Sequence, residues 1–212
     1  MNKGTWLVSV LIFISITSTS CLSMIYYPSR VLDKGGVYLG LGTHVERRWD
    51  DATEMAVYSS LYSRFGLGGG FDGGLELRLA SGLPYAADLS ARKQFNFNAI
   101  VIDGVTLAGG IGLSNAFPLE WNGSICFLKK AFSLTIGTAQ NQAGDYLGEY
   151  SYIINSTYAR AAYEFTIGKH LVVMPFVSGR HANIYKENYG ENLEFWQRNQ
   201  MGVGLSIAFK SK

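Results

Sequence analysis

The sequence predicts an all-β protein, a closed antiparallel up-and-down transmembrane β-barrel of about ten strands. Three observations lead to this prediction. Apolar residues alternate with polar or small residues along much of the chain, which is the period of a β-strand. Charged residues make up only 16 % of the 212 residues, whereas apolar residues make up 48 %. Short and longer connections also alternate along the chain, as they do in barrels that cross a membrane.

The clearest alternation lies at residues 75–79, where leucines alternate with Glu76 and Arg78. Successive side chains of a strand point to opposite faces, so the leucines share one face and the two charges share the other. Similar segments give ten predicted strands: 36–48, 55–67, 73–81, 89–102, 105–114, 120–128, 131–139, 150–165, 170–185 and 197–209. Without residues 120–128 and one neighbouring strand, the number is eight.

The connections between these strands fall into two sets. The predicted short turns are 68–72, 103–104, 129–130 and 166–169. The predicted longer loops are 49–54, 82–88, 115–119, 140–149 and 186–196. Asp103-Gly104 is the strongest hairpin signal, because both central residues of a type I′ turn need a positive φ. Pro175 interrupts strand 170–185 and predicts a local bulge there.

The charge content decides which face of the sheet points outward. A soluble β-sandwich carries charge on its outer face, and here charge is too sparse to cover one. A membrane barrel has an apolar outside, a polar interior and no open sheet edge. The residues predicted to face lipid are Val37, Leu39, Leu41, Val57, Leu61, Phe65, Leu75, Leu77, Leu79, Phe95, Phe97, Val101, Phe132, Leu134, Ile136, Val203, Leu205, Ile207 and Phe209.

The N-terminus has the pattern of an export signal, with Lys3, an apolar run over 7–16 and small polar residues up to Ser20. The run is too short to span a bilayer as a helix. This segment resembles a bacterial lipoprotein signal, which implies lipidation of Cys21. Ordinary cleavage near Ser20 is the alternative. The predicted regions are a signal peptide (1–20), an N-terminal periplasmic segment (21–35), the barrel (36–209) and a tail (210–212).

The barrel region, residues 36–209, resembles small bacterial outer-membrane β-barrel proteins. The final strand is similar to the C-terminal assembly signal of these proteins, with alternate apolar residues that end on Phe209. Residues 64–67, a Gly-rich turn and residues 75–77 also resemble a hairpin of such barrels. The resemblance implies a bacterial outer-membrane location, contact with lipid, and recognition by the barrel-assembly machinery through residues Gln197 to Phe209.

Side chains fill the interior of a narrow barrel, so acidic and basic groups there are expected to pair. The predicted interior charge network consists of His44, Glu46, Arg64, Glu76, Arg78, Arg160, Glu164 and Arg198. Gln94, Asn96, Asn98 and Gln200 are expected to line the same interior. The sequence thus favours a structural or surface-exposed barrel with a plugged interior. The alternatives are a narrow channel for ions or small solutes, an outer-membrane hydrolase, and a lipid-tethered, soluble, lipocalin-like barrel.

Several activities lack their signals in the sequence. His44 and Glu46 offer a base and its orienting group, and Asp50 with Asp51 offers paired carboxylates. However, no Gly-x-Ser-x-Gly nucleophile motif is present, so we expect no enzyme. The two cysteines suggest no metal site, and no cofactor is expected. A net charge of +2 gives no basic surface for nucleic acid.

Overall fold

The computed structural model describes residues 27–48, 55–80, 83–97, 99–114, 119–144, 150–188 and 191–211. In this part of the chain, eleven strands form one antiparallel sheet. They are β1 (Val37–Arg48), β2 (Met55–Gly68), β3 (Phe71–Ala80), β4 (Leu83–Asn96), β5 (Gly104–Ser114), β6 (Leu119–Lys129), β7 (Phe132–Gly144), β8 (Tyr150–Tyr163), β9 (Phe165–Ile167), β10 (Leu171–Asn188) and β11 (Glu191–Ser211).

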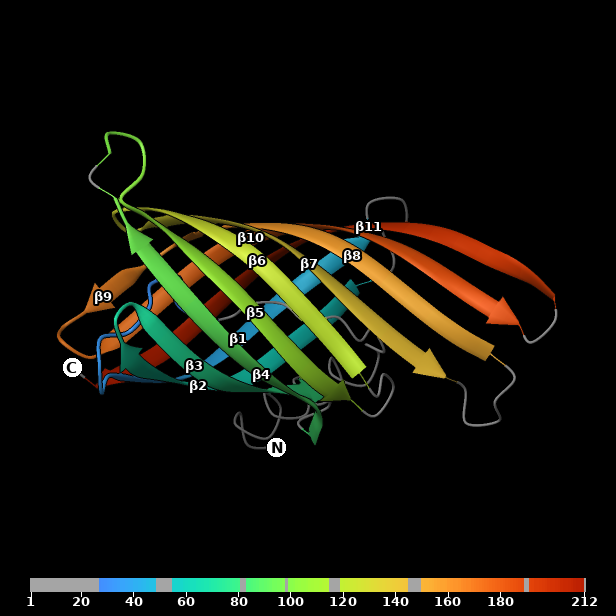
Figure 1. Cartoon of the computed structure of the whole chain (residues 1–212), viewed down its shortest axis with the longest axis horizontal. Coiled ribbons are helices and arrows are strands. Elements are labelled where there is room, and N and C mark those ends of the chain that lie inside the picture. Colours follow the sequence, from blue (N-terminus) through green and yellow to red (C-terminus); the bar gives the residue numbers. More distant parts are fainter. Residues whose placement is uncertain are drawn as a thin grey trace, which may run out of the picture.

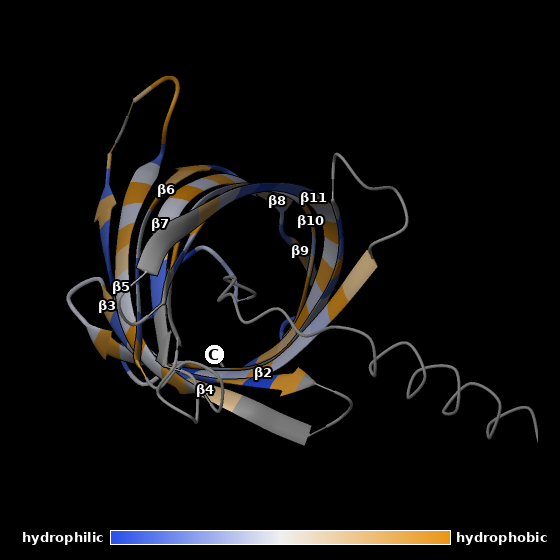
Figure 2. Ribbon diagram, turned by 90° about the vertical axis from the view of Figure 1, so that its right-hand side faces the viewer, coloured by the Kyte–Doolittle hydropathy of each residue, from blue (hydrophilic) through white to orange (hydrophobic). Residues whose placement is uncertain are grey.

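The sheet closes into a barrel because β11 pairs with both β10 and β1 (Figures 1 and 2). Strand β9 extends β8 beyond Glu164 and pairs with the same neighbour, β10. Ten strands of the described residues therefore make up the wall, each antiparallel to the next. The predicted closed, up-and-down, ten-strand barrel is confirmed. No helix among the described residues is long and apolar enough to cross a membrane.

The wall is apolar outside and mostly polar inside, because the exposed side chains of its strands are largely apolar and most of the buried ones are polar or charged. Leu75 on β3 is 40 % exposed, whereas Arg78 on the same strand is 2 % exposed and points into the interior. None of the residues predicted to face lipid is buried. This polarity is opposite to that of a lipocalin-like barrel, whose interior is apolar. The soluble alternative therefore does not fit the structure.

The connection between β4 and β5 differs from the prediction. Strand β4 begins at Leu83, not at residue 89, and ends at Asn96, not at residue 102. Asp103 and Gly104 do not have positive φ, so the predicted type I′ turn is wrong. Instead, the Asp103 N–H donates to the Leu128 carbonyl, and its carboxylate binds the next turn. Asn96, predicted inside, is exposed at the end of the strand, and Asn98 lies outside the described residues.

Strands β10 and β11 form the tallest hairpin of the barrel (Figure 1). Residues 186–196 were predicted as a loop, but β10 reaches Asn188 and β11 begins at Glu191. Strand β1 ends at Arg48, opposite Gln200, so the earlier residues of β11 pair with β10 alone. Likewise, β4 occupies most of the loop predicted at 82–88.

Pro175 lies where the ladder between β10 and its neighbour is interrupted. Strand β8 ends at Tyr163 and β9 begins at Phe165, with the same register on both sides of the gap. Proline has no N–H to donate to a ladder, which accounts for the break. The predicted bulge is thus an interruption without a shift in register.

Candidate functional site

The barrel interior contains most of the buried charge. Among the described residues, five arginines and five carboxylates are buried there, so the two signs balance. They are Arg64, Arg78, Arg92, Arg160, Arg180, Glu46, Asp72, Glu76, Asp88 and Glu120. A balanced interior favours internal ion pairs over selection of a solute by its charge.

One cluster, the Asp72 cluster, lies near the β2–β3 turn and consists of Arg64, Asp72, Ser90 and Arg92. The Asp72 carboxylate accepts hydrogen bonds from both guanidinium groups, with Arg64 Nη2 at 2.6 Å and Arg92 Nη2 at 2.5 Å. Arg64 Nη1 also donates to Ser90 Oγ at 2.8 Å. Buried ions of this kind need both a partner of opposite charge and hydrogen bonds, and here one carboxylate serves two cations.

The chain before β1 enters the interior and covers this cluster. We call residues 27–32 the N-terminal plug. The Tyr27 ring lies 4.2 Å from the Arg64 guanidinium carbon and 4.7 Å from that of Arg92. Arg92 donates to the carbonyls of Pro28 (2.5 Å) and Arg30 (3.1 Å). The cation–π contacts and hydrogen bonds fix the plug against β2 and β4.

The plug also reaches the opposite side of the barrel. The Ser29 N–H donates to Glu164 Oε1 at 2.6 Å, and the Ser29 hydroxyl lies 2.7 Å from Ser133 Oγ. Arg160 Nη2 donates to Ser29 Oγ at 3.3 Å. The cavity between Tyr27, Arg92 and Arg160 has a volume of only about 10 Å³. That is room for no more than one water molecule.

Two further clusters lie farther from the termini. In the Arg78 cluster, Arg78 Nε is 2.9 Å from Asp88 Oδ2, and a second nitrogen of Arg78 donates to Glu120. In the His44 cluster, His44 Nε2 is 3.0 Å from Glu46 Oε1, and Arg180 Nη1 is 3.2 Å from Glu46 Oε2. The Arg78 cluster joins β3 to β4 and β6, and the His44 cluster joins β1 to β10, which both pair with β11.

The structure brings together part of the predicted network. His44 contacts Glu46, while Arg160 and Glu164 meet through Ser29. Glu76 is buried near Arg78 on β3. Arg198 is half-buried and lies opposite Ala182. This pair belongs to the part of the β10–β11 hairpin that extends beyond the end of β1, away from the clusters described above. Gln94 accepts a hydrogen bond from the plug residue Val31, and Gln200 is buried.

Five charged residues of these clusters were not predicted: Asp72, Asp88, Arg92, Glu120 and Arg180. Asp72 and Asp88 fall in predicted turns, because the strands that carry them begin earlier than predicted. Arg92 and Glu120 do lie on inward positions of predicted strands, so the alternation contained the signal for them. Arg180 lies on a strand whose two faces are both apolar at its start, which leaves the inward face undefined by the sequence.

The interior offers little room for catalysis. His44 is 1 % exposed, stacks on Tyr58 with ring centroids 4.7 Å apart and lies 6.0 Å from the Phe176 ring. Among the described residues, no group of three or more His, Cys, Asp or Glu side chains is arranged to hold a metal ion. Cys126 is a buried free thiol. Cys21, Asp50 and Asp51 lie outside the described residues.

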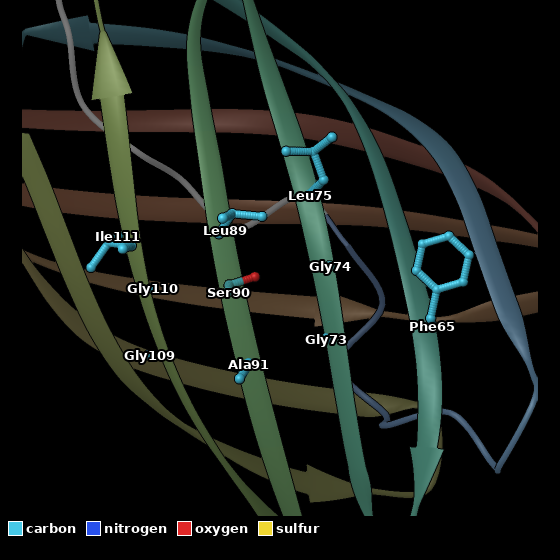
Figure 3. Close-up of a pocket in the computed structure, with 10 residues that line it drawn as sticks. All are labelled: Phe65, Gly73, Gly74, Leu75, Leu89, Ser90, Ala91, Gly109, Gly110 and Ile111. Atoms are coloured by element: carbon cyan, nitrogen blue, oxygen red, sulfur yellow. The ribbon is translucent and has the colours of Figure 1, made fainter.

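The outer wall carries a shallow apolar groove of about 650 Å³ (Figure 3). Gly73, Ala91 and Gly109 form its floor on three adjacent strands. Leu75, Leu89 and Ile111 line one side of it and Phe65 stands at one end, next to Gly73. The groove opens onto the outer face of the wall, and its lining also includes Ser90, whose hydroxyl accepts the hydrogen bond from Arg64 in the Asp72 cluster.

No protein-family model matches the sequence, and no curated protein matches it. Solved structures with a similar strand arrangement include Ail, the attachment invasion locus protein of Yersinia pestis, with 11 % identity, a TM-score of 0.33 and coverage of 84 % of this chain and 99 % of that chain. The outer membrane protein OprG from Pseudomonas aeruginosa has 6 % identity, a TM-score of 0.34 and coverage of 87 % and 99 %. A de novo designed transmembrane β-barrel has 12 % identity, a TM-score of 0.31 and coverage of 85 % and 99 %.

The described residues form a closed ten-strand antiparallel barrel whose outer face is apolar and whose interior is charged. With identities of 6–12 % and TM-scores of 0.31–0.34, the similarity to these solved structures assigns no family, ligand or activity to this chain. An apolar outer face around a charged interior is the polarity typical of β-barrels that cross a membrane.

Proposed function

We propose that this protein is an integral barrel of the bacterial outer membrane with a closed interior, and that its role is structural or surface-exposed. The observation that carries the proposal is the burial of five arginines and five carboxylates, most of them in ion pairs, inside a wall whose outer face is apolar. A wall of this polarity is unfavourable in water, since the apolar side chains would remain hydrated. In a bilayer the same side chains contact lipid.

The route to the membrane is part of the same proposal. Residues 1–20 direct export, and Cys21 is the candidate for lipidation. Strand β11 is the candidate for recognition by the assembly machinery, because Val203, Leu205, Ile207 and Phe209 all point outward. The first and last described residues lie at the same end of the barrel, since β1 and β11 pair from Val37 and Ser211. We assign this end to the periplasm, as is usual for such barrels.

A closed interior argues against a channel. The N-terminal plug contacts opposite sides of the barrel, and the two remaining charge clusters hold further inward side chains in ion pairs. A channel would require these contacts to open. The burial of His44 between Tyr58 and Phe176 likewise supports a role in packing over one in hydrolysis.

The extension of β10 and β11 supports a role at the cell surface. It rises beyond the end of β1 on the side opposite to the termini (Figure 1). Phe195 and Trp196 are exposed on it, and the Phe195 ring lies 5.1 Å from that of Tyr185. Exposed aromatic side chains on a paired, rigid hairpin are suited to contact lipid headgroups or an extracellular partner.

The test uses the chain without residues 1–20 and with Cys21→Ser. We expect this protein to need detergent for solubility and to migrate differently on a gel before and after heating. In planar bilayers it should be silent, whereas deletion of the N-terminal plug should produce current. A monomer that is soluble without detergent would contradict membrane insertion. Discrete conductance steps of the protein with its plug would establish the channel instead.

A further inference from the structure

The loop between β4 and β5, residues 97–103, projects from the outer face of the barrel (Figures 1 and 2). It lies at the end that carries the termini, and both views show it pointing away from the wall. Ile100 is 96 % exposed and Val101 is 78 % exposed, while Phe97 is also exposed. The loop thus presents apolar side chains outside the barrel, beyond the last pair of the ladder between β4 and β5.

The base of this loop is fixed by several contacts. The Phe97 N–H donates to the Asp103 carbonyl, and the Asp103 N–H donates to the Leu128 carbonyl, both at 2.8 Å. The Asp103 carboxylate accepts a hydrogen bond from the Lys130 N–H (2.5 Å) and lies 3.0 Å from Lys129 Nζ. The exposed apolar tip is therefore held in a defined position by the neighbouring β6–β7 turn.

The surroundings of the loop combine apolar and cationic groups. The loop continues the outward apolar row of the wall, because Phe95 pairs with Val105 directly before it and faces outward. Lys129 and Lys130 lie at its base, and Lys130 is exposed. Apolar tips that enter the acyl region and lysines that bind phosphate groups are the chemistry of a membrane interface.

We propose that Phe97, Ile100 and Val101 insert into the phospholipid leaflet next to the termini and anchor the barrel at that interface. Ile100 and Val101 lie among the acyl chains, and Lys129 and Lys130 bind lipid phosphates. The proposal rests on the membrane location given above and adds a specific lipid contact made by a loop instead of a strand. Water is a poor partner for side chains as exposed as Ile100 and Val101, since removing apolar surface from water is favourable.

The test places one fluorophore at a time on the full chain with Cys21→Ser and Cys126→Ser. The label is attached through Val101→Cys, with Leu107→Cys on the outer wall as the membrane reference and exposed Asp33→Cys as the water reference. The protein is reconstituted into vesicles of phosphatidylcholine and phosphatidylglycerol. Lipids with a nitroxide on the acyl chain quench labels in the bilayer, and iodide quenches labels in water.

We expect the Val101 label to follow the Leu107 label, with quenching by the lipid nitroxide and protection from iodide. Quenching of the Val101 label by iodide alone would overturn the proposal. Protection from both quenchers would also overturn it, and would indicate contact with a second copy of the chain. If the Leu107 label itself escapes the lipid nitroxide, the membrane location fails. If only the Val101 label escapes it, the location stands and the anchor fails.

Discussion

Glycines on the two faces of the barrel wall have different surroundings. On the inner face, a Cβ on Gly204 would lie 2.2 Å from the Phe176 ring, and one on Gly137 would lie 2.4 Å from the Tyr158 ring. On the outer face, a Cβ on Gly73, Gly109 or Gly123 would meet no atom closer than 3.7 Å, 3.8 Å and 3.9 Å, respectively. The interior is therefore packed as tightly as a protein core, although it is polar, whereas the outer wall leaves free space.

This difference indicates that inner positions constrain their side chains more strictly than outer positions do. An inner side chain must match both the shape and the charge of the side chains around it, as Asp72 on β3 does with Arg64 on β2 and Arg92 on β4. An outer side chain needs only to be apolar, because lipid adapts to its shape. We therefore expect substitutions inside the barrel to be costly and equivalent substitutions outside to be tolerated.

The largest effect is expected for Asp72→Asn, which removes the carboxylate that Arg64 and Arg92 share. Loss of one partner from a buried ion pair costs about 3–5 kcal/mol, so the free energy of unfolding should fall by about that amount. Urea unfolding in detergent micelles, followed by gel migration without heating, measures it. Asp33→Asn, at an exposed site in the segment before β1, is the matched control and should change little. Equal effects of both substitutions would contradict this stricter constraint on inner positions.

A pair of glycine substitutions compares the two faces directly. Gly204→Val forces the Phe176 ring and the His44 side chain to move, and overpacking of this kind costs about 1–3 kcal/mol. Gly109→Val adds a β-branched residue where space is free, so stability should stay unchanged or rise by about 0.5–1 kcal/mol. The same urea titration measures both. A loss from Gly109→Val as large as that from Gly204→Val would show that the outer groove is also tightly constrained.

The smallest effect concerns Asp103, which lies outside the strands. The hydrogen bond from the Lys130 N–H, followed by that from the Lys129 ammonium, lowers the pKa of the Asp103 carboxyl below its usual value. This group therefore stabilises the folded state above the ordinary aspartate pKa, and the contribution disappears as pH falls through the lowered pKa. Asp103→Asn should reduce stability slightly at neutral pH and leave it unchanged at acidic pH, below that pKa. Urea unfolding at the two pH values tests this. An equal loss of stability at both would show that the ionisation of Asp103 does not contribute to it.

The alternation of side chains was sufficient to predict the barrel, its strand number and its outer face. Residues 75–79 show why, because a period of two places every second residue on the same face whatever its neighbours are. The ends of strands were less predictable. Residues 97 and 99–102 were predicted as the end of a strand, yet they lie in a loop whose base is held by Asp103 against the neighbouring turn. Contacts of this kind depend on residues distant in sequence.

The charge clusters were predicted only in part, because their members depend on where strands begin and on contacts between residues distant in sequence. The inward position of Arg64 follows from its own strand, but its partner Asp72 lies in a predicted turn. The place of Tyr27 between two guanidinium groups has no periodic signal at all, because the segment before β1 has no regular structure. Only the closed barrel defines the space that this segment fills.

The plug has a consequence for the order of assembly. Its residues bind Arg92 on β4, Ser133 on β7 and Glu164 beyond β8, which are 64, 104 and 135 positions away along the chain. These partners surround the plug only after most of the strands have joined the ring. Residues 27–32 precede every strand in the sequence, yet they are among the last to reach their final position. Until then, the growing barrel has an open centre through which water can reach its arginines.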